Sequence, residues 1–199
     1  MSVLPSILTR QPVVLDHPRN SDMTLLEAAR EMNRDALVEI FDRYSPALYN
    51  YAFRLCNDSR TADYVVGDVF AKLLEQLSAG NGPSSNLRSY LYESTYHLIV
   101  DDARHSHRMA PLEVVDSING DAYSPSATFE NQALLKTIMQ AIREDLTEDQ
   151  RHVIILRFLE GFSLRETAKI IGKQVNYVKV IQNRGIMALR KVLGYEAIK

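Results

Sequence analysis

The sequence predicts an all-α protein with two small helical domains joined by a flexible acidic linker, the C-terminal domain carrying a helix-turn-helix. Two observations favour this fold class. Apolar residues recur at helical spacing through most of the chain, and no strand-like alternation of useful length appears. Between the two helical regions, residues 111–135 carry four acidic side chains and no Lys or Arg, which is typical of a linker.

Composition limits the class of protein further. The chain has 199 residues, of which 46% are hydrophobic and 24% charged, as in ordinary globular domains. It contains no run of about 18 apolar residues and no secretory signal, so we expect a cytoplasmic protein without membrane insertion. The single cysteine, Cys56, excludes an internal disulfide. A net charge of −2 is low for a protein that binds bulk nucleic acid alone, and this indicates a partner.

Residues 1–21 contain three prolines and no periodic pattern, so we expect a flexible N-terminal tail. Four helices are expected in the first domain, residues 22–109, and they cover residues 22–32, 36–56, 60–77 and 87–104. Pro46 should kink or restart the second helix. The polar residues 57–59 form a break and a cap, and the Gly/Pro/Ser-rich residues 78–86 form a loop.

The linker is expected over residues 110–131, and the second domain over 132–199. Its first helix should cover 133–146. Thr147 and Gln150 have the spacing of a capping box, which predicts a helix to about Glu160. Ser163 and Glu166 repeat that spacing and open a short helix to residue 171. Glycines 161 and 172 end these two helices, and a turn over 173–176 leads to a longer helix ending near residue 192.

The short helix, glycine turn and longer helix predict a helix-turn-helix, a unit that places its second helix in the DNA major groove. One stripe of the last helix is expected to pack inward: Val178, Ile181, Gly185, Ala188, Leu189 and Val192. The opposite stripe is expected to face outward: Asn176, Lys179, Val180, Asn183, Arg184 and Met187. Residues 163–199 hold eight Lys/Arg against two Glu, a local excess that suits a polyanion.

Two segments resemble the extracytoplasmic-function (ECF, group IV) sigma factors of bacterial RNA polymerase. DALVEIFDRYSPALYNYAFRLCNDSRTADYVVGDVFAKLL resembles the family's domain two, and LTEDQRHVIILRFLEGFSLRETAKIIG, followed by YVK and ALR, resembles domain four. The resemblance implies a non-enzymatic factor without cofactors that binds core polymerase and directs promoter recognition, DNA melting and transcription initiation. Its implied partners are the β′ clamp helices and β flap of core RNA polymerase, promoter DNA and an anti-sigma factor.

The resemblance also assigns residues to three surfaces, position by position. Polymerase binding falls on the helix with Ala62 and Phe70, at Asp63, Val66, Asp68 and Val69. Recognition of the −10 element falls on Asn86, Arg88, Tyr92, Tyr96, His97, Arg104 and Arg108. Recognition of the −35 element falls on Tyr177, Lys179, Val180, Asn183 and Arg184. Phe70 is expected in the core, as is Tyr90, which takes the place of the family's buried Trp.

Two alternatives stay open at the level of sequence. A stand-alone helix-turn-helix regulator that binds duplex operators without polymerase would have the same last helix. His97, Asp101 and His105 are spaced i, i+4 and i+8 on one helix face, a pattern that could hold zinc or iron. No partner cluster accompanies these three residues, and we predict no metal site.

Overall fold

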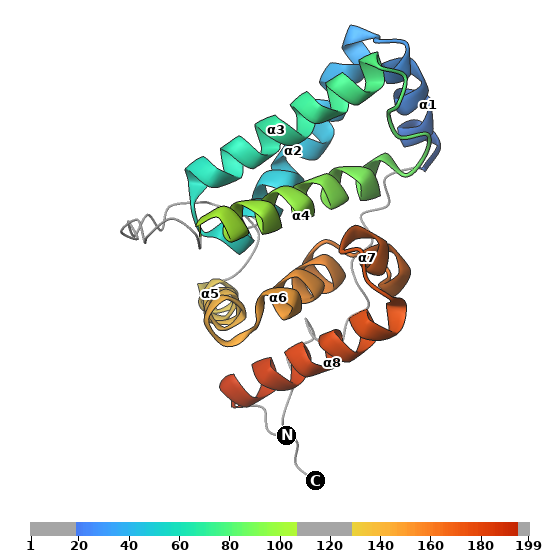
Figure 1. The fold of residues 1–199 in the computed structure, drawn as a ribbon. Helices are drawn as coiled ribbons and strands as arrows, with labels where there is room; N and C mark the ends of the chain where they lie inside the picture. The colour runs from blue at the N-terminus through green and yellow to red at the C-terminus, as the bar shows by residue number, and fades with distance from the viewer. Residues whose placement is uncertain (1–18, 107–128, 195–199) are drawn as a thin grey trace. The chain divides into compact units, whose positions relative to one another are not determined.

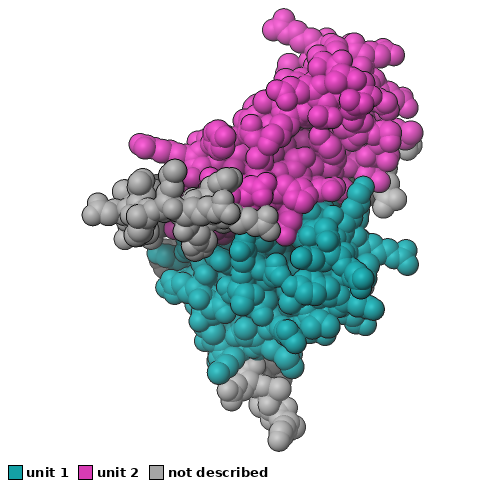
Figure 2. Space-filling model, in the orientation of Figure 1, with its two compact units in different colours: residues 1–15, 121–199 teal, residues 16–120 magenta. Residues whose placement is uncertain are grey.

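The computed structural model describes residues 19–106 and 129–194, with side chains for residues 22–102 and 135–194 (Figure 1). Within these ranges every regular element is a helix and no strand is present. The chain divides into two compact units, which Figure 2 shows in separate colours. We call them the N-terminal unit, with helices α1 to α4, and the C-terminal unit, with the remaining helices. The predicted fold class is confirmed. The predicted tail and linker fall mostly outside the described residues.

The N-terminal unit begins with α1 (Arg19–Arg30) and α2 (Arg34–Cys56). The predicted extension of the first helix to residue 32 is wrong, because Met32 has a φ of 58° and belongs to the turn. Asp22 of α1 holds the two helices together. Its carboxylate accepts hydrogen bonds from Arg43 Nη1 at 2.8 Å and from the Tyr44 hydroxyl at 2.6 Å. Burial, together with the Asp22 hydrogen bond, raises the pKa of Tyr44.

Pro46 lies inside α2, which is one unbroken helix from residue 34 to residue 56. The sequence predicted a kink or a restart at Pro46, and the restart does not occur. Pro46 and Asp42, four residues earlier, are both exposed. Water can bind the Asp42 carbonyl that lacks a helical donor, which lowers the cost of a proline at this position.

A polar junction separates α2 from α3 (Ser59–Ser78), as the sequence predicts. Asn57 takes the left-handed conformation that ends α2, and Asp58 caps α3 by accepting from Thr61 N at 2.8 Å. After the predicted loop, α4 (Leu87–Ser106) packs on both α2 and α3. The core of the unit includes Ile40, Leu48, Tyr51, Val65, Val69, Leu73, Leu91 and Tyr92.

The C-terminal unit consists of α5 (Phe129–Asp145), α6 (Glu148–Ile154), the π-helix η1 (Ile155–Leu159), α7 (Leu164–Ile170) and α8 (Val175–Val192). Helix α5 begins inside the range predicted as linker, and α8 includes the last two residues of the predicted turn. The helix predicted over 147–160 is present, but its last part is a π-helix. Arg157 lies within this π-helix, and its Nη1 donates to the carbonyl oxygen of Phe162 beyond the helix end.

Among the described residues of this unit, His152 is the buried titratable side chain, 1% exposed next to the buried Val153 and Ile154. Burial, with a smaller effect of the neighbouring Arg151, lowers the pKa of His152 to about 4. The folded unit therefore holds a neutral imidazole at pH 7. Helices α5, α6 and α7 all pack against α8, so α8 is the element around which the unit is built.

Candidate nucleic-acid interface

The two short helices before α8 are delimited by short-range capping and by glycines. Ser163 N donates to Glu166 Oε2 at 2.8 Å, and Glu166 N donates to Ser163 Oγ at 3.2 Å, which completes the predicted capping box of α7. Thr147 N likewise donates to Gln150 Oε1 at 3.0 Å at the start of α6. Gly161 and Gly172 have φ values of 74° and 64°, a region that L side chains rarely adopt. These local signals fix where α6 and α7 begin and where η1 and α7 end.

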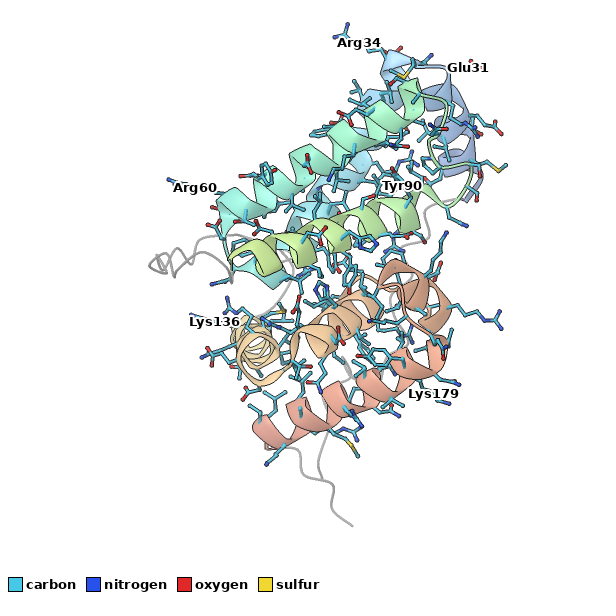
Figure 3. The ribbon with its side chains drawn as sticks, viewed as in Figure 1. Glu31, Arg34, Arg60, Tyr90, Lys136 and Lys179 are labelled. Carbon is cyan, nitrogen blue, oxygen red and sulfur yellow. The ribbon has the colours of Figure 1, made fainter. Side chains whose placement is uncertain are left out.

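The outward stripe of α8 is exposed as predicted. Its exposed residues are Asn176, Lys179, Val180, Asn183, Arg184 and Met187. Figure 3 labels Lys179 near the start of this helix. The stripe contains two cations, two amides and no acid, a set that can contact phosphates and base edges.

Tyr177 sits at the edge of this stripe and is tied to another helix. Its hydroxyl donates to the carboxylate of Asp149 on α6, and Lys173 Nζ lies 5.7 Å from its ring centroid. The side chain remains 38% exposed, so the ring is held in place while part of it stays accessible. The sequence placed Tyr177 at the helix start but gave no sign of the Asp149 contact, which links residues 28 positions apart.

Two further contacts fix α8 against the rest of the unit. Arg157 Nε donates to Gln182 Oε1 at 2.8 Å, and burial lowers the pKa of Arg157. Gly185 packs against Ile154 so closely that an added Cβ would lie 3.0 Å from Ile154 Cγ1. Arg157 was missed by sequence reasoning, because its role depends on the π-helix and on a partner 25 residues away.

The inward stripe of α8 is confirmed from Val178 to Leu189, except for the half-buried Ala188. Val178, Ile181, Gly185 and Leu189 are buried. Ala188 is half-buried, and the prediction for Val192 is wrong because its side chain is 48% exposed. Val192 is the last residue of α8, and within the described residues no further helix follows that could cover it.

The residues assigned to −10 recognition fall into different environments. Asn86 is exposed with a φ of 53° before α4, and His97 is exposed on α4. Arg88 is half-buried, with its guanidinium carbon 5.5 Å from the Tyr92 ring centroid. Arg104 belongs to α4 but its side chain is not described. Arg108 lies outside the described residues.

The two tyrosines of this set belong to the core. Tyr92 and Tyr96 are 1% and 8% exposed, and the Tyr92 ring lies 5.2 Å from the Tyr51 ring. A ring enclosed in this way has no free face for a base, so stacking by these tyrosines does not fit the structure. Tyr90, which the sequence placed in the core, is only half-buried and is labelled in Figure 3. The structure thus buries Tyr92 and Tyr96, which the sequence analysis assigned to DNA recognition, and leaves Tyr90, which it assigned to the core, half-buried.

The residues assigned to polymerase binding also divide into surface and core. Asp63 is exposed, and the Asp68 side chain is 29% exposed with an ion pair to Lys72 at 2.9 Å. Val66 and Val69 are 7% and 0% exposed and cannot contact a partner directly in this conformation. Phe70 is 8% exposed, as the core prediction requires.

Sequence reasoning missed four exposed apolar side chains on α2 and α3. They are Val38 and Phe41 on α2 and Tyr64 and Leu74 on α3, which are between 40% and 67% exposed. The Phe41 ring lies 4.8 Å from the ring of Phe70, which belongs to the core. The available signal was a surplus of apolar residues, since each helix carries more of them than one inward stripe can hold.

The metal hypothesis rests on three residues of α4. His97 and Asp101 are both exposed, and the side chain of His105 is not described. Among the described side chains, no three His, Cys, Asp or Glu residues converge in a way that could hold a metal ion. No helix within the described ranges is long and apolar enough to span a membrane.

Two helical units, one with a helix-turn-helix and a cationic outward face, define a two-domain helical DNA-binding factor. Residues 40–109 match the family described as Sigma-70 region 2, and residues 144–191 match the family described as Sigma-70, region 4. Together these matches cover more than half of the chain. The chain belongs to the extracytoplasmic-function group of RNA polymerase sigma factors. The match to region 2 disfavours the stand-alone regulator.

Curated relatives and solved structures agree with this assignment. The ECF RNA polymerase sigma factor BldN of Streptomyces coelicolor is 25% identical over 88% of this chain and 67% of its own length. The ECF RNA polymerase sigma factor SigX of Bacillus subtilis is 28% identical over 76% of this chain and 80% of its own length.

Two structures share the fold, each with a TM-score of 0.64. The sigma factor RpoE of Bartonella quintana, in complex with the anti-sigma factor NepR, is 22% identical and covers 80% of this chain and 97% of its own. CnrH, in complex with the cytosolic domain of CnrY, is 20% identical and covers 89% and 99%.

Proposed function

We propose that this sigma factor works as a non-enzymatic, cytoplasmic adaptor whose N-terminal unit holds core RNA polymerase while its C-terminal unit reads the −35 element. The exposed cationic stripe of α8 is the observation that carries the proposal. Region 2 of the family covers most of the N-terminal unit, and region 4 covers α6 to α8. The predicted domains, residues 22–109 and 132–199, are part of this proposal.

For the −35 element, the proposed contacts are Tyr177, Lys179, Val180, Asn183 and Arg184. All are exposed and lie in the first three turns of α8. Lys179 and Arg184 suit phosphate or guanine contacts, and Asn183 suits adenine. The ties from Tyr177 to Asp149 and from Gln182 to Arg157 support a fixed orientation of the helix. A fixed orientation reduces the ordering cost of binding.

For the −10 element, the proposed contacts are Asn86, Arg88, His97, Arg104 and Arg108. Promoter opening requires bases that are removed from the duplex, and such bases are held by pockets and by polar and aromatic groups. Asn86, at the start of this set, and His97, in its middle, are exposed. Tyr92 and Tyr96 are left out because they pack in the core.

For core polymerase, we propose that Asp63 and Asp68 contact the β′ clamp helices and that the exposed apolar residues beside them form the centre of the contact. Interfaces of this kind combine an apolar, aromatic centre with charged residues at the rim. Tyr64 and Phe41 are 67% and 44% exposed, so they provide that centre better than the buried Val66 and Val69. The C-terminal unit would contact the β flap.

An anti-sigma factor is a further proposed partner. The RpoE structure of Bartonella quintana contains the anti-sigma factor NepR, and its sigma chain shares this fold. By analogy with this complex, we propose that an anti-sigma factor covers the polymerase-binding surface of the N-terminal unit. Competition between that protein and core polymerase for the full chain would be its measurable sign.

The test of the proposed function is in vitro transcription by core RNA polymerase with and without the full-length chain on a library of genomic fragments. We expect specific start sites that share upstream −35 and −10 elements and that need the added chain. Tight operator binding by the chain alone, with no polymerase-dependent start site, would overturn the proposal.

A further inference from the structure

Val180 is one of two apolar side chains, with Met187, in the DNA-facing stripe of α8. It is 47% exposed, and its neighbours on the stripe, Lys179, Asn183 and Arg184, are also exposed. Figure 3 locates this part of α8 through the labelled Lys179. Val180 takes no part in the core of the unit, which is filled from the opposite side of α8 by Val178 and Ile181.

Helix geometry gives Val180 the same direction as two base-reading candidates. Residues three and four positions apart lie next to each other on a helix surface, with Cβ atoms about 5–6 Å apart. Asn183 and Arg184 stand in this relation to Val180. A helix that enters the major groove contacts bases mainly through its N-terminal residues. Val180 lies in the second turn of α8, whereas Met187, the other exposed apolar residue of the stripe, lies two turns further on.

The chemistry of the major groove leaves one partner for such a side chain. Every base edge there offers polar acceptors or donors, and the apolar group among them is the C5 methyl of thymine. Valine can neither donate nor accept, so placing it against a guanine or adenine edge removes water from polar atoms without replacing the hydrogen bonds. Against a thymine methyl, the same burial is favourable.

Local structure gives no other reason for a valine at this position. A β-branched residue on an exposed helix face is less favourable for the helix than alanine, so Val180 does not serve helix stability. Its restricted χ1 is an advantage in recognition, because little rotamer freedom is lost on contact. We propose that Val180 is a specificity-determining residue that selects thymine at one position of the −35 element through the 5-methyl group. This inference rests on the proposed −35 recognition by α8.

The test uses holoenzyme assembled from core polymerase and the full chain, and promoters with a randomised −35 region and a fixed −10 region. Transcribed sequences are selected with wild-type chain, with Val180→Ala and with Val192→Ala. Val192 is the matched control, because it is the same residue type, equally exposed at 48%, and lies on the same helix. It is about 18 Å further along the helix axis. We expect one thymine that is enriched by wild type and by Val192→Ala but not by Val180→Ala.

The second step isolates the methyl group. Deoxyuridine replaces thymine at that position, which removes only the methyl. Binding of the wild-type holoenzyme should fall about fourfold, the effect of burying about one CH₂ equivalent, whereas the Val180→Ala holoenzyme should bind both promoters equally. Equal effects of the methyl on wild type and Val180→Ala, or no thymine dependent on residue 180, would overturn the inference while leaving −35 recognition intact. A library from which no holoenzyme starts transcription would instead overturn the proposed function.

Discussion

Helices α3 and α8 present different chemistry to solvent. The outward stripe of α8 carries Lys179, Arg184 and amides with two apolar residues, and no acid. The exposed side of α3 carries both signs of charge, Asp63 and Glu75 with Arg60 and Lys72, together with the apolar Tyr64 and Leu74. Cations and amides without acids fit the phosphates and base edges of DNA, while mixed charges beside exposed apolar side chains fit a protein. The difference supports the proposed division of labour between these two helices, in which α3 contacts the protein partner and α8 contacts the −35 element.

The same contrast extends to the way each helix is fixed. Helix α3 is held mainly by a row of buried apolar side chains, from Ala62 to Leu77. Helix α8 has fewer buried residues and is positioned in addition by Arg157, by Asp149 and by the close approach of Ile154 to Gly185. A reading helix needs one defined orientation, and polar ties and close packing provide that orientation.

Phe70→Ala is expected to have the largest effect on stability. The ring is 8% exposed and lies 4.8 Å from Phe41, so its removal leaves a cavity in the N-terminal unit. Truncation of a buried phenylalanine costs about 3–5 kcal/mol. Urea unfolding of the full chain, followed by circular dichroism, measures the loss. A loss of less than about 1 kcal/mol in the free energy of unfolding would show that Phe70 is not a core residue of α3.

The pH dependence of the C-terminal unit should be the next largest effect. The pKa of His152 is lowered by burial to about 4 in the folded chain from an ordinary 6.5. The unfolded chain therefore binds the proton first as pH falls. This stabilising contribution is fully present above pH 6.5 and is lost between 6.5 and about 4, by about 3 kcal/mol.

His152→Leu should reduce this pH dependence, whereas His97→Gln, on the exposed face of α4, should not. Urea unfolding between pH 7 and pH 4 compares the three chains. An unchanged pH profile in His152→Leu would show that His152 is not the responsible group.

A matched pair of glycine substitutions tests the different packing of the two helices. A Cβ at Gly67 of α3 has no atom within 4 Å, so Gly67→Ala should stabilise the chain by up to about 1 kcal/mol through helix propensity. A Cβ at Gly185 of α8 meets Ile154, which is 2% exposed and has little room to move. Gly185→Ala should destabilise by about 1–2 kcal/mol, and adding Ile154→Val should recover part of the loss. Effects of the same sign at both glycines would contradict the close approach.

Lys179→Ala should have the smallest effect on stability. The side chain is exposed and belongs to no core, so the free energy of unfolding should change by less than about 0.5 kcal/mol. A larger loss would mean that Lys179 contributes to the stability of the C-terminal unit rather than being free to contact DNA.

The sequence was sufficient wherever a short-range rule fixes the outcome. Capping at Ser163 and Asp58 and the glycines at 161 and 172 follow from contacts within a few residues, and the outward stripe of α8 follows from helical periodicity. Periodicity also separates Tyr90 from Tyr92, which lie on different sides of α4, but it does not say which side faces the core. That depends on Tyr51 of α2, a partner 41 positions away in the sequence.

Other features depend on contacts that a sequence does not show. Within the π-helix at 155–159, Arg157 donates a hydrogen bond to the Phe162 carbonyl. Tyr177 is fixed by its hydrogen bond to Asp149. On α3, Val66 and Val69 match the family's docking pattern, yet they fill the core and leave the surface to their neighbours. A residue at a position of the family motif can therefore serve either the core or the interface, and only the burial of its side chain shows which.

The most direct test of the division of labour is a paired measurement on Asp68→Ala and Arg184→Ala. Each chain is assayed for its affinity for core polymerase and for transcription from promoters with and without a −35 element. Asp68→Ala should weaken core binding by about five- to tenfold and leave the preference for the −35 element unchanged. Arg184→Ala should bind core normally and lose about five- to tenfold of the −35 preference. Loss of core binding by Arg184→Ala, or of −35 preference by Asp68→Ala, would contradict the account.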